Sequence, residues 1–147
     1  MKISSKNLLA AITLPMLLAA CQSNGETKQM TATDFQHHNW ELAQIDGQDI
    51  ELTDNMKAPR LEIGENMTAN GYAGCNNFFG QAELKDNQLR IDKMGMTMKM
   101  CPDAQMEIEQ AMSQTLMEWS DVTLTDTQLT LTNGLHTLTF NLRDWVN

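Results

Sequence analysis

The stretch of sequence that decides the fold opens with GYAGCNNFFG (71–80) and closes with MGMTMKMCP (94–102). Each segment contains one cysteine, Cys75 in the first and Cys101 in the second. A helix-start signal follows at once, because proline is tolerated in the first turn of a helix and Asp103 suits the positive end of the helix dipole. The pattern predicts a scaffold in which a disulfide closes the segment between the two cysteines.

The length and charge of the chain limit its class and its partners. A chain of 147 residues fits one domain with a real hydrophobic core. Its 10 basic residues against 19 acidic ones give a formal net charge of -9. Such a chain repels phosphate backbones and anionic membrane surfaces, so we expect no nucleic-acid partner. Any membrane attachment must then be hydrophobic or covalent.

The first residues supply such an attachment. Lys2 and Lys6 precede a short apolar run (8–20) that is too short to span a bilayer and is typical of a secretory signal. The run ends in LAAC (18–21), which resembles the bacterial lipobox. The resemblance implies that the preceding residues are a lipoprotein signal peptide, cleaved before Cys21.

In that interpretation, Cys21 is the lipid attachment site, and its acyl chains anchor the protein stably in a membrane. The residue after it is Gln22 rather than aspartate, a pattern that goes with the outer membrane. We therefore expect an outer-membrane lipoprotein whose domain faces the periplasm. The alternative is an ordinary signal peptide (1–20) with Cys21 as a free thiol.

Lipidation also determines which cysteines remain free to pair. Of three cysteines it uses one and leaves Cys75 and Cys101 as a pair in an oxidising compartment. A disulfide across that segment would stabilise the fold by about 3.5 kcal/mol on the chain-entropy model. The alternative is two buried free thiols.

The mature chain divides into a polar tether (21–34) and a folded domain (35–147). In the domain, alternating apolar residues between turn signals such as Asp46-Gly47 and Lys85-Asp86-Asn87 predict a meander of strands. The apolar positions of these predicted strands are Trp40, Leu42, Ile45, Ile50, Leu52, Leu61, Ile63, Met67, Ala69, Phe78 or Phe79, Ala82, Leu84, Leu89 and Ile91.

The C-terminal segment predicts a hairpin. Asn133-Gly134 is a strong signal for a two-residue turn. That turn would place Thr132 opposite Leu135, Leu129 opposite Leu138 and His136 opposite Leu131. Strand parity then puts five apolar side chains on one buried face: Leu129, Leu131, Leu138, Phe140 and Leu142.

One amphipathic helix is predicted at about 104–119. Ile108, Met112, Leu116 and Trp119 follow helical spacing, with Ala111 and Thr115 beside them. The acidic residues Glu107, Glu109 and Glu118 fall largely on the other side, which we interpret as a solvated face; a partner-binding face is the alternative.

Four methionines occupy every second position before the helix. A strand would place Met94, Met96, Met98 and Met100 on one face. Thioether arrays bind Cu(I), which gives the row a functional interpretation. We favour a core-facing strand filled with adaptable apolar side chains, and so expect no metal site.

No catalytic motif is present. The glycines form neither G-x-G-x-x-G nor a phosphate-binding loop, and there is no Gly-x-Ser-x-Gly elbow or His-Glu-x-x-His. Carboxylates are scattered in turns and on the helix, and Asn76 and Asn77 are best explained as turn residues. We expect no catalytic residues and no cofactor.

The spacings Gly74-Cys75-Asn76-x-Phe78-x-Gly80 and Met96-Thr97-x-x-Met100-Cys101, followed by an acidic helix, resemble the META domain family. The resemblance implies an α+β fold, an antiparallel β-sheet curled into a partial barrel with one helix packed on it. It implies a structural role for five motif residues: Gly74, Asn76, Phe78, Gly80 and Met100. It also implies an outer-membrane lipoprotein of the envelope and heat-stress response, linked to novobiocin tolerance.

We therefore expect a monomer that is attached to the membrane by its lipid and binds an unknown envelope protein or apolar ligand. Alternatives within the binding class are a secretin pilot or acyl-chain carrier and an inhibitor of a cell-wall hydrolase. An enzyme is the third hypothesis, which a pocket with converging titratable groups would favour.

Overall fold

The computed structural model describes residues 29–53 and 55–144. The signal peptide, Cys21 and most of the tether predicted from the sequence lie outside these residues. The described part of the chain contains nine strands, one α-helix and two short 3-10 helices. The strands are β1 (His38–Ile45), β2 (Gln48–Asp49), β3 (Arg60–Ile63), β4 (Thr68–Tyr72), β5 (Asn77–Lys85), β6 (Gln88–Met96), β7 (Ser120–Leu124), β8 (Gln128–Thr132) and β9 (Thr137–Leu142). The helices are η1 (Ala32–Asp34), η2 (Glu65–Met67) and α1 (Asp103–Met117).

The strands form one antiparallel sheet in the order β2-β1-β3-β4-β5-β6-β7-β8-β9. A further pairing between β1 and β9 closes the sheet, so that eight of the described strands make a barrel and β2 extends beside β1. The α+β class, the curled sheet and the single packed helix are confirmed, and the sheet closes where the sequence predicted a partial barrel.

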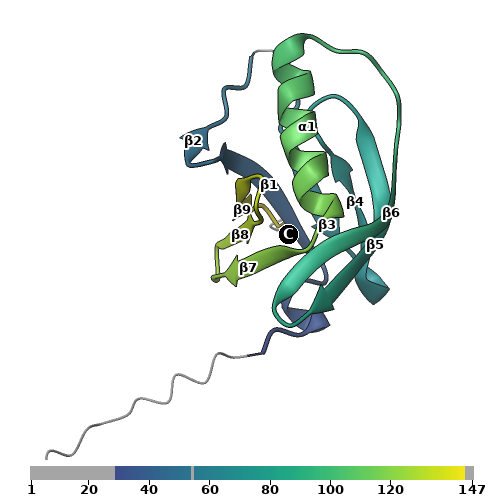
Figure 1. Cartoon of the computed structure of the whole chain (residues 1–147), viewed down its shortest axis with the longest axis vertical. Helices are drawn as coiled ribbons and strands as arrows, with labels where there is room; N and C mark the ends of the chain where they lie inside the picture. The colour runs from purple at the N-terminus through teal and green to yellow at the C-terminus, as the bar shows by residue number, and fades with distance from the viewer. Residues whose placement is uncertain (1–28, 54, 145–147) are drawn as a thin grey trace, which may run out of the picture.

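The helix α1 lies between the two halves of the barrel. It connects β6 to β7 and packs on β6 and β9 (Figure 1). The pairing of β6 with β7 is short, limited to Gln88 opposite Asp121 and Leu89 opposite Ser120. Beyond these pairs β6 continues beside β5 alone, and the strand then runs into the loop that leads to α1.

The barrel interior is filled by side chains at the positions that alternation predicted. Phe78 lies in the core, whereas Phe79 is 64% exposed. The fully buried large side chains are Trp40, Phe35, Phe78, Phe140, Leu61, Ile63, Leu89, Ile91, Met112, Leu116, Leu129 and Leu131. The second strand predicted at Ile50 and Leu52 is misplaced, because β2 is Gln48–Asp49 and both residues follow it outside any strand, with Leu52 exposed.

The register predicted for the C-terminal hairpin is wrong by two residues. Thr132 pairs with Thr137, and Leu129 pairs with Phe140. The Asn133 side-chain oxygen accepts hydrogen bonds from the backbone N–H groups of Leu135 and His136, which makes a longer turn than Asn-Gly alone. Because the side-chain period of a strand is two, the shift leaves the buried face unchanged.

The helix ends two residues before the predicted end. The Ser120 hydroxyl is buried and donates to the carbonyl of Thr115 at 2.9 Å, which satisfies one of the last carbonyls of α1. Trp119 therefore lies outside the helix, where the Arg90 guanidinium stacks 4.7 Å from its ring centroid. Met112 and Leu116 are buried as predicted.

Candidate functional site

The methionine row of the sequence divides into two parts. Met94 and Met96 lie in β6 and pack partly buried against the core. Met98 and Met100 follow the end of β6 and are 95% and 90% exposed. The prediction that the whole row faces the core is wrong for these two residues, because the strand ends at Met96 and the chain leaves the barrel. We call residues 97–101 the methionine loop.

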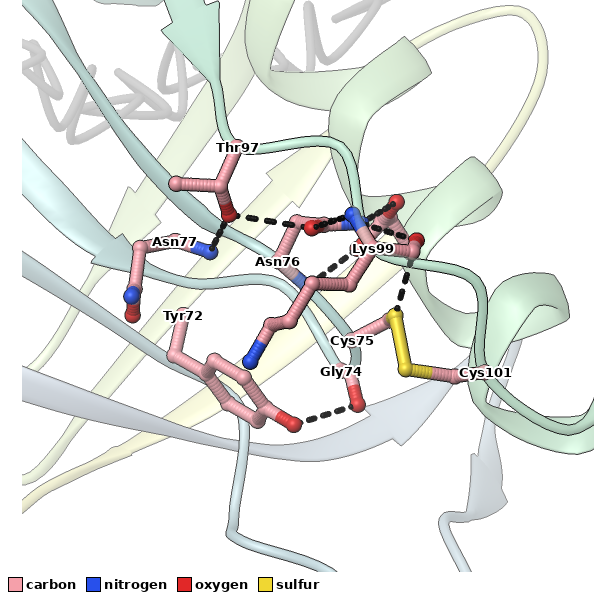
Figure 2. Close-up of a disulfide and its surroundings, with 9 residues drawn as sticks. Tyr72, Gly74, Cys75, Asn76, Asn77, Thr97, Lys99 and Cys101 are labelled. Carbon is pink, nitrogen blue, oxygen red and sulfur yellow. Dashed lines mark hydrogen bonds between the residues drawn. A yellow bond between two sulfur atoms is a disulfide. The ribbon is translucent and has the colours of Figure 1, made fainter.

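The loop is held by Asn76, which is 2% exposed. Its side-chain oxygen accepts hydrogen bonds from the Thr97 hydroxyl at 2.9 Å and the Lys99 N–H at 2.6 Å. Its side-chain nitrogen donates to the Lys99 carbonyl at 3.0 Å (Figure 2). Asn76 is therefore more than a turn residue, since one buried amide binds the loop at two positions.

Glu109 completes this network from α1. Its two carboxylate oxygens accept hydrogen bonds from the Asn76 backbone N–H at 2.6 Å and from the Asn76 side-chain nitrogen at 2.9 Å. Glu109 is buried, so its assignment to the solvated face of the helix is wrong. The helical spacing could have predicted this burial, because Glu109 precedes the buried Met112 by three residues and Leu116 by seven, which places all three on one face of the helix.

The disulfide anchors the end of the loop. Cys75 and Cys101 are bonded to each other, and their Cα atoms lie 5.9 Å apart (Figure 2). Thr97, Lys99 and Cys101 are thus all attached to the segment 75–77. Met98 and Met100, which lie between these three residues, take no part in the attachments.

The remaining motif residues allow the segments next to the loop to pack closely. Gly74 has a φ of +119°, and a Cβ there would meet the Gln105 carbonyl at 3.0 Å and Ile108 at 3.1 Å. Glycine therefore allows the segment 75–77 to approach the first turns of α1. A Cβ on Gly80 would lie 2.5 Å from Ile91, which explains glycine at the irregular register of β5 and β6. Phe78 is part of the core.

A pocket of about 310 Å³ lies between the methionine loop and α1. Four of its lining residues are methionines: Met96, Met98, Met100 and Met106. Asn76 and Glu109 also line it, but their polar atoms are engaged with each other and with the loop. Thr97 and Lys99 complete the lining, and the Thr97 hydroxyl donates to Asn76, so the pocket offers four thioethers and the Lys99 side chain.

A second pocket, of about 410 Å³, lies at η1 and the start of β1. Its lining residues are Thr33, Asp34, His38, Trp40, Leu124, Thr125, Asp126 and Leu142. The Trp40 indole N–H is buried and has no hydrogen-bond partner. The His38 ring nitrogen Nδ1 lies 2.6 Å from the Asp144 carboxylate, which also accepts the Asn39 N–H at 2.9 Å. This pair joins the start of β1 to the chain beyond β9.

The other described histidine–carboxylate pair joins two loops. His136 Nδ1 lies 2.8 Å from Asp46, and the Thr137 N–H donates to the same carboxylate at 2.8 Å. These hydrogen bonds, that from His136 first, lower the pKa of Asp46 below its ordinary value of 3.8. His136 does not pair with Leu131 as the predicted register required.

Within 29–53 and 55–144, no three His, Cys, Asp or Glu side chains are grouped so that they could hold a metal ion. None of the helices in that part of the chain has the length and apolar character to cross a membrane.

Comparisons with known proteins agree with the motif. The family model of the META domain matches residues 33–145. Heat shock protein HslJ of Escherichia coli (strain K12) is 34% identical over 143 residues, which cover 97% of this chain and 99% of that protein. A solved NMR structure shares 33% identity with a TM-score of 0.69, covering 80% of this chain and 99% of its own.

A second NMR structure, of a protein from Burkholderia xenovorans, has a TM-score of 0.64 at 19% identity. It covers 97% of this chain and 100% of its own, and it supports the fold alone. The family model spans nearly all of the described barrel, the Asn76 network and the cysteine pair. The chain belongs to the META domain family.

Proposed function

We propose that this protein is an outer-membrane-anchored lipoprotein of the heat and envelope stress response that acts by binding, through the methionine loop, and not by catalysis. Its relative's name as a heat shock protein supports the stress context. The lipobox supports the anchor at Cys21 and a domain facing the periplasm. A contribution to novobiocin tolerance is part of the same proposal.

The observation that carries the proposal is the exposure of Met98 and Met100 on a fixed backbone. Burial of a large apolar side chain stabilises a fold by about 1.5–3 kcal/mol, and both residues forgo this gain. Yet the loop that presents them is attached through a buried amide, a buried carboxylate and a disulfide. A rigid loop with exposed adaptable side chains is what a binding surface requires.

The closed barrel bears on the choice between the alternative binding functions. An acyl-chain carrier needs an apolar cavity, but the interior here is occupied by buried side chains from the strands and α1. The external pocket at the methionine loop is the more suitable place for a ligand or partner. A secretin pilot or an inhibitor of a cell-wall hydrolase would also use an exposed loop of this kind.

The proposal is tested by site-specific photocrosslinking in living cells. A photoreactive residue replaces Met98, and the control places it at Leu135, which is 61% exposed on the β8–β9 turn. We expect a captured species at position 98 that is absent at position 135. Identical patterns at both positions, or no capture at 98, would contradict the proposal.

A genetic test accompanies the crosslinking. In a strain lacking the gene, the natural chain should restore heat and novobiocin tolerance. The double variant Met98→Gln and Met100→Gln should not, because it removes the apolar thioether surface while leaving the backbone attachments in place. Full restoration by this variant would separate the phenotype from the methionine loop.

A second candidate function is acid–base catalysis in the pocket at η1. Three titratable residues line that pocket, and His38 is oriented there by Asp144. Asp34, however, accepts two hydrogen bonds from Thr31, one from its N–H and one from its hydroxyl. A His38→Gln variant that lost stress tolerance while remaining folded would favour this candidate.

A further inference from the structure

The methionine loop faces a pocket whose ligand chemistry is unusual, because sulfur dominates it. We propose that Met96, Met98, Met100 and Met106 form a binding site for a monovalent copper ion, Cu(I). This inference rests on the proposed function, since it names the ligand of the same binding surface.

The donor set selects the ion. Neutral thioethers are soft ligands, and among biological metals they favour Cu(I) over Zn²⁺, Mg²⁺ or Ca²⁺. A borderline or hard ion would need imidazole, thiolate or carboxylate ligands, and no suitable group of His, Cys, Asp or Glu exists within the described residues. The bond between Cys75 and Cys101 also removes their thiolates from competition for the metal.

The backbone geometry brings the thioethers within reach of one ion. Met98 and Met100 are two residues apart in an extended segment, which places their Cα atoms about 6.6 Å apart on the same side. Each side chain has three rotatable bonds, so two sulfur atoms can converge on one ion from that separation. Met106 lines the opposite wall from the first turns of α1, and Met96 lies at the end of β6.

The attachments of the loop lower the entropic cost of binding. Asn76 binds the backbone of Lys99 through both its N–H and its carbonyl, and the disulfide holds the next alternate residue. Only the methionine side chains then remain to be ordered when the ion binds.

The charge near the pocket favours a cation. The Glu109 carboxylate lies at the floor of the pocket, and the whole chain carries a formal charge of -9. Lys99 also lines the pocket, and its side chain points toward the Tyr72 ring in the close-up (Figure 2). The negative charge of Glu109 and of the whole chain therefore favours a bound ion of single positive charge.

The test is a Cu(I) titration of the full-length chain purified in detergent. Free thiols are blocked with N-ethylmaleimide, ascorbate keeps copper reduced without air, and a chromophoric Cu(I) chelator competes for the metal. We expect one ion per chain. The double variant Met98→Leu and Met100→Leu should bind at least about 10- to 100-fold more weakly, the loss that removal of even an outer-shell partner causes.

Leucine is chosen because it keeps the apolar surface and removes the sulfur. The matched control is Met117→Leu, a methionine that is 45% exposed on α1 and does not line the pocket. Thermal unfolding followed by circular dichroism confirms that the variants fold. Equal Cu(I) affinity in the natural chain and the double leucine variant would overturn the inference.

X-ray absorption at the copper edge provides a second readout. Coordination by sulfur alone is expected, and a spectrum dominated by nitrogen would assign the metal to histidines and overturn the inference. The crosslinking test separates this failure from failure of the proposed function. If the double leucine variant loses copper but still restores stress tolerance, the proposed function depends on the apolar surface and the copper site is a distinct property. Equal Cu(I) affinity in the natural chain and the double leucine variant, together with capture at position 98, would overturn the copper site and leave the proposed function standing.

Discussion

The methionine loop and the pocket at η1 differ in which of their side chains are buried and which are exposed. The loop is attached to a buried, mutually hydrogen-bonded pair, Asn76 and Glu109, while its apolar side chains Met98 and Met100 are exposed. In the pocket, the apolar Trp40 is buried with an unpaired indole N–H, and the polar pair of His38 and Asp144 is partly exposed. Buried polar networks fix a backbone strongly, whereas exposed pairs contribute little. The comparison indicates that the backbone of the loop is held by buried polar contacts, which supports the binding role that we propose for it.

The largest effect should come from the disulfide. Replacing Cys75 and Cys101 by alanine removes a bridge between residues 26 apart in sequence. On the chain-entropy model this costs about 3.5 kcal/mol of unfolding free energy. Chemical denaturation measures the loss, and hydrogen exchange should show faster opening at residues 97–101 than at β1. Equal changes at both places would mean that the bridge stabilises the barrel as a whole.

The Asn76→Ala variant should show the second largest loss of stability. It removes four side-chain hydrogen bonds, two accepted and two donated, and takes a partner from the buried Glu109 carboxylate and from the Lys99 backbone. A buried polar group left without its partner costs about 1–3 kcal/mol. We expect a loss of about 3 kcal/mol in urea denaturation. The matched control is Asn77→Ala next to it, whose exposed side chain should contribute less than about 0.5 kcal/mol. Similar losses in the two variants would contradict the assigned role of Asn76.

Asp144→Ala tests the pocket side of the comparison. It removes the partner of the His38 ring and of the Asn39 N–H. Both groups retain access to water in part, so we expect a loss of about 1 kcal/mol. Asp126→Ala, an exposed lining residue of the same pocket, serves as the control. A loss as large as that of Asn76→Ala would remove the contrast between the two regions.

The pair of Asp46 and His136 should give a small effect that depends on pH. Because the folded pKa of Asp46 is lowered below 3.8, its stabilising contribution is present above that value and is lost as the pH falls through the folded pKa. Near neutral pH, the free energy of unfolding of the natural chain should exceed that of the Asp46→Asn variant by less than about 1 kcal/mol, since the Asp46 side chain is 51% exposed. Unfolding curves at several pH values should show this difference shrinking in acid. A difference that grows in acid would reverse the sign of the argument.

The smallest effect on stability is expected at the tips of the loop. Met98→Ala and Met100→Ala should change the free energy of unfolding by less than about 0.5 kcal/mol, because both side chains are exposed. Met112→Ala is the matched comparison in the core and should cost about 2–5 kcal/mol. Thermal and urea unfolding measure both. A large loss at position 98 would make the loop methionines structural.

Local patterns in the sequence were sufficient for most of the fold. Alternation places Leu61, Ile63, Leu89 and Ile91 in the barrel interior, and helical spacing places Met112 there. These predictions hold because burial of an apolar side chain depends on the period of its own element. Even the wrong register at Asn133 kept the right face, since an error of two residues preserves strand parity.

The sequence by itself thus determined the helix, the apolar faces and the motif that marks the family, and the resemblance to that family implied the α+β class. Tertiary structure alone decided three other features: the closure of β1 on β9, the burial of Glu109 against Asn76, and the exposure of Met98 and Met100. Each of them depends on contacts between residues far apart in the chain, or on where a strand ends relative to the barrel. A periodic pattern gives the direction of a side chain from its backbone, but only the packed structure determines whether protein or solvent lies in that direction.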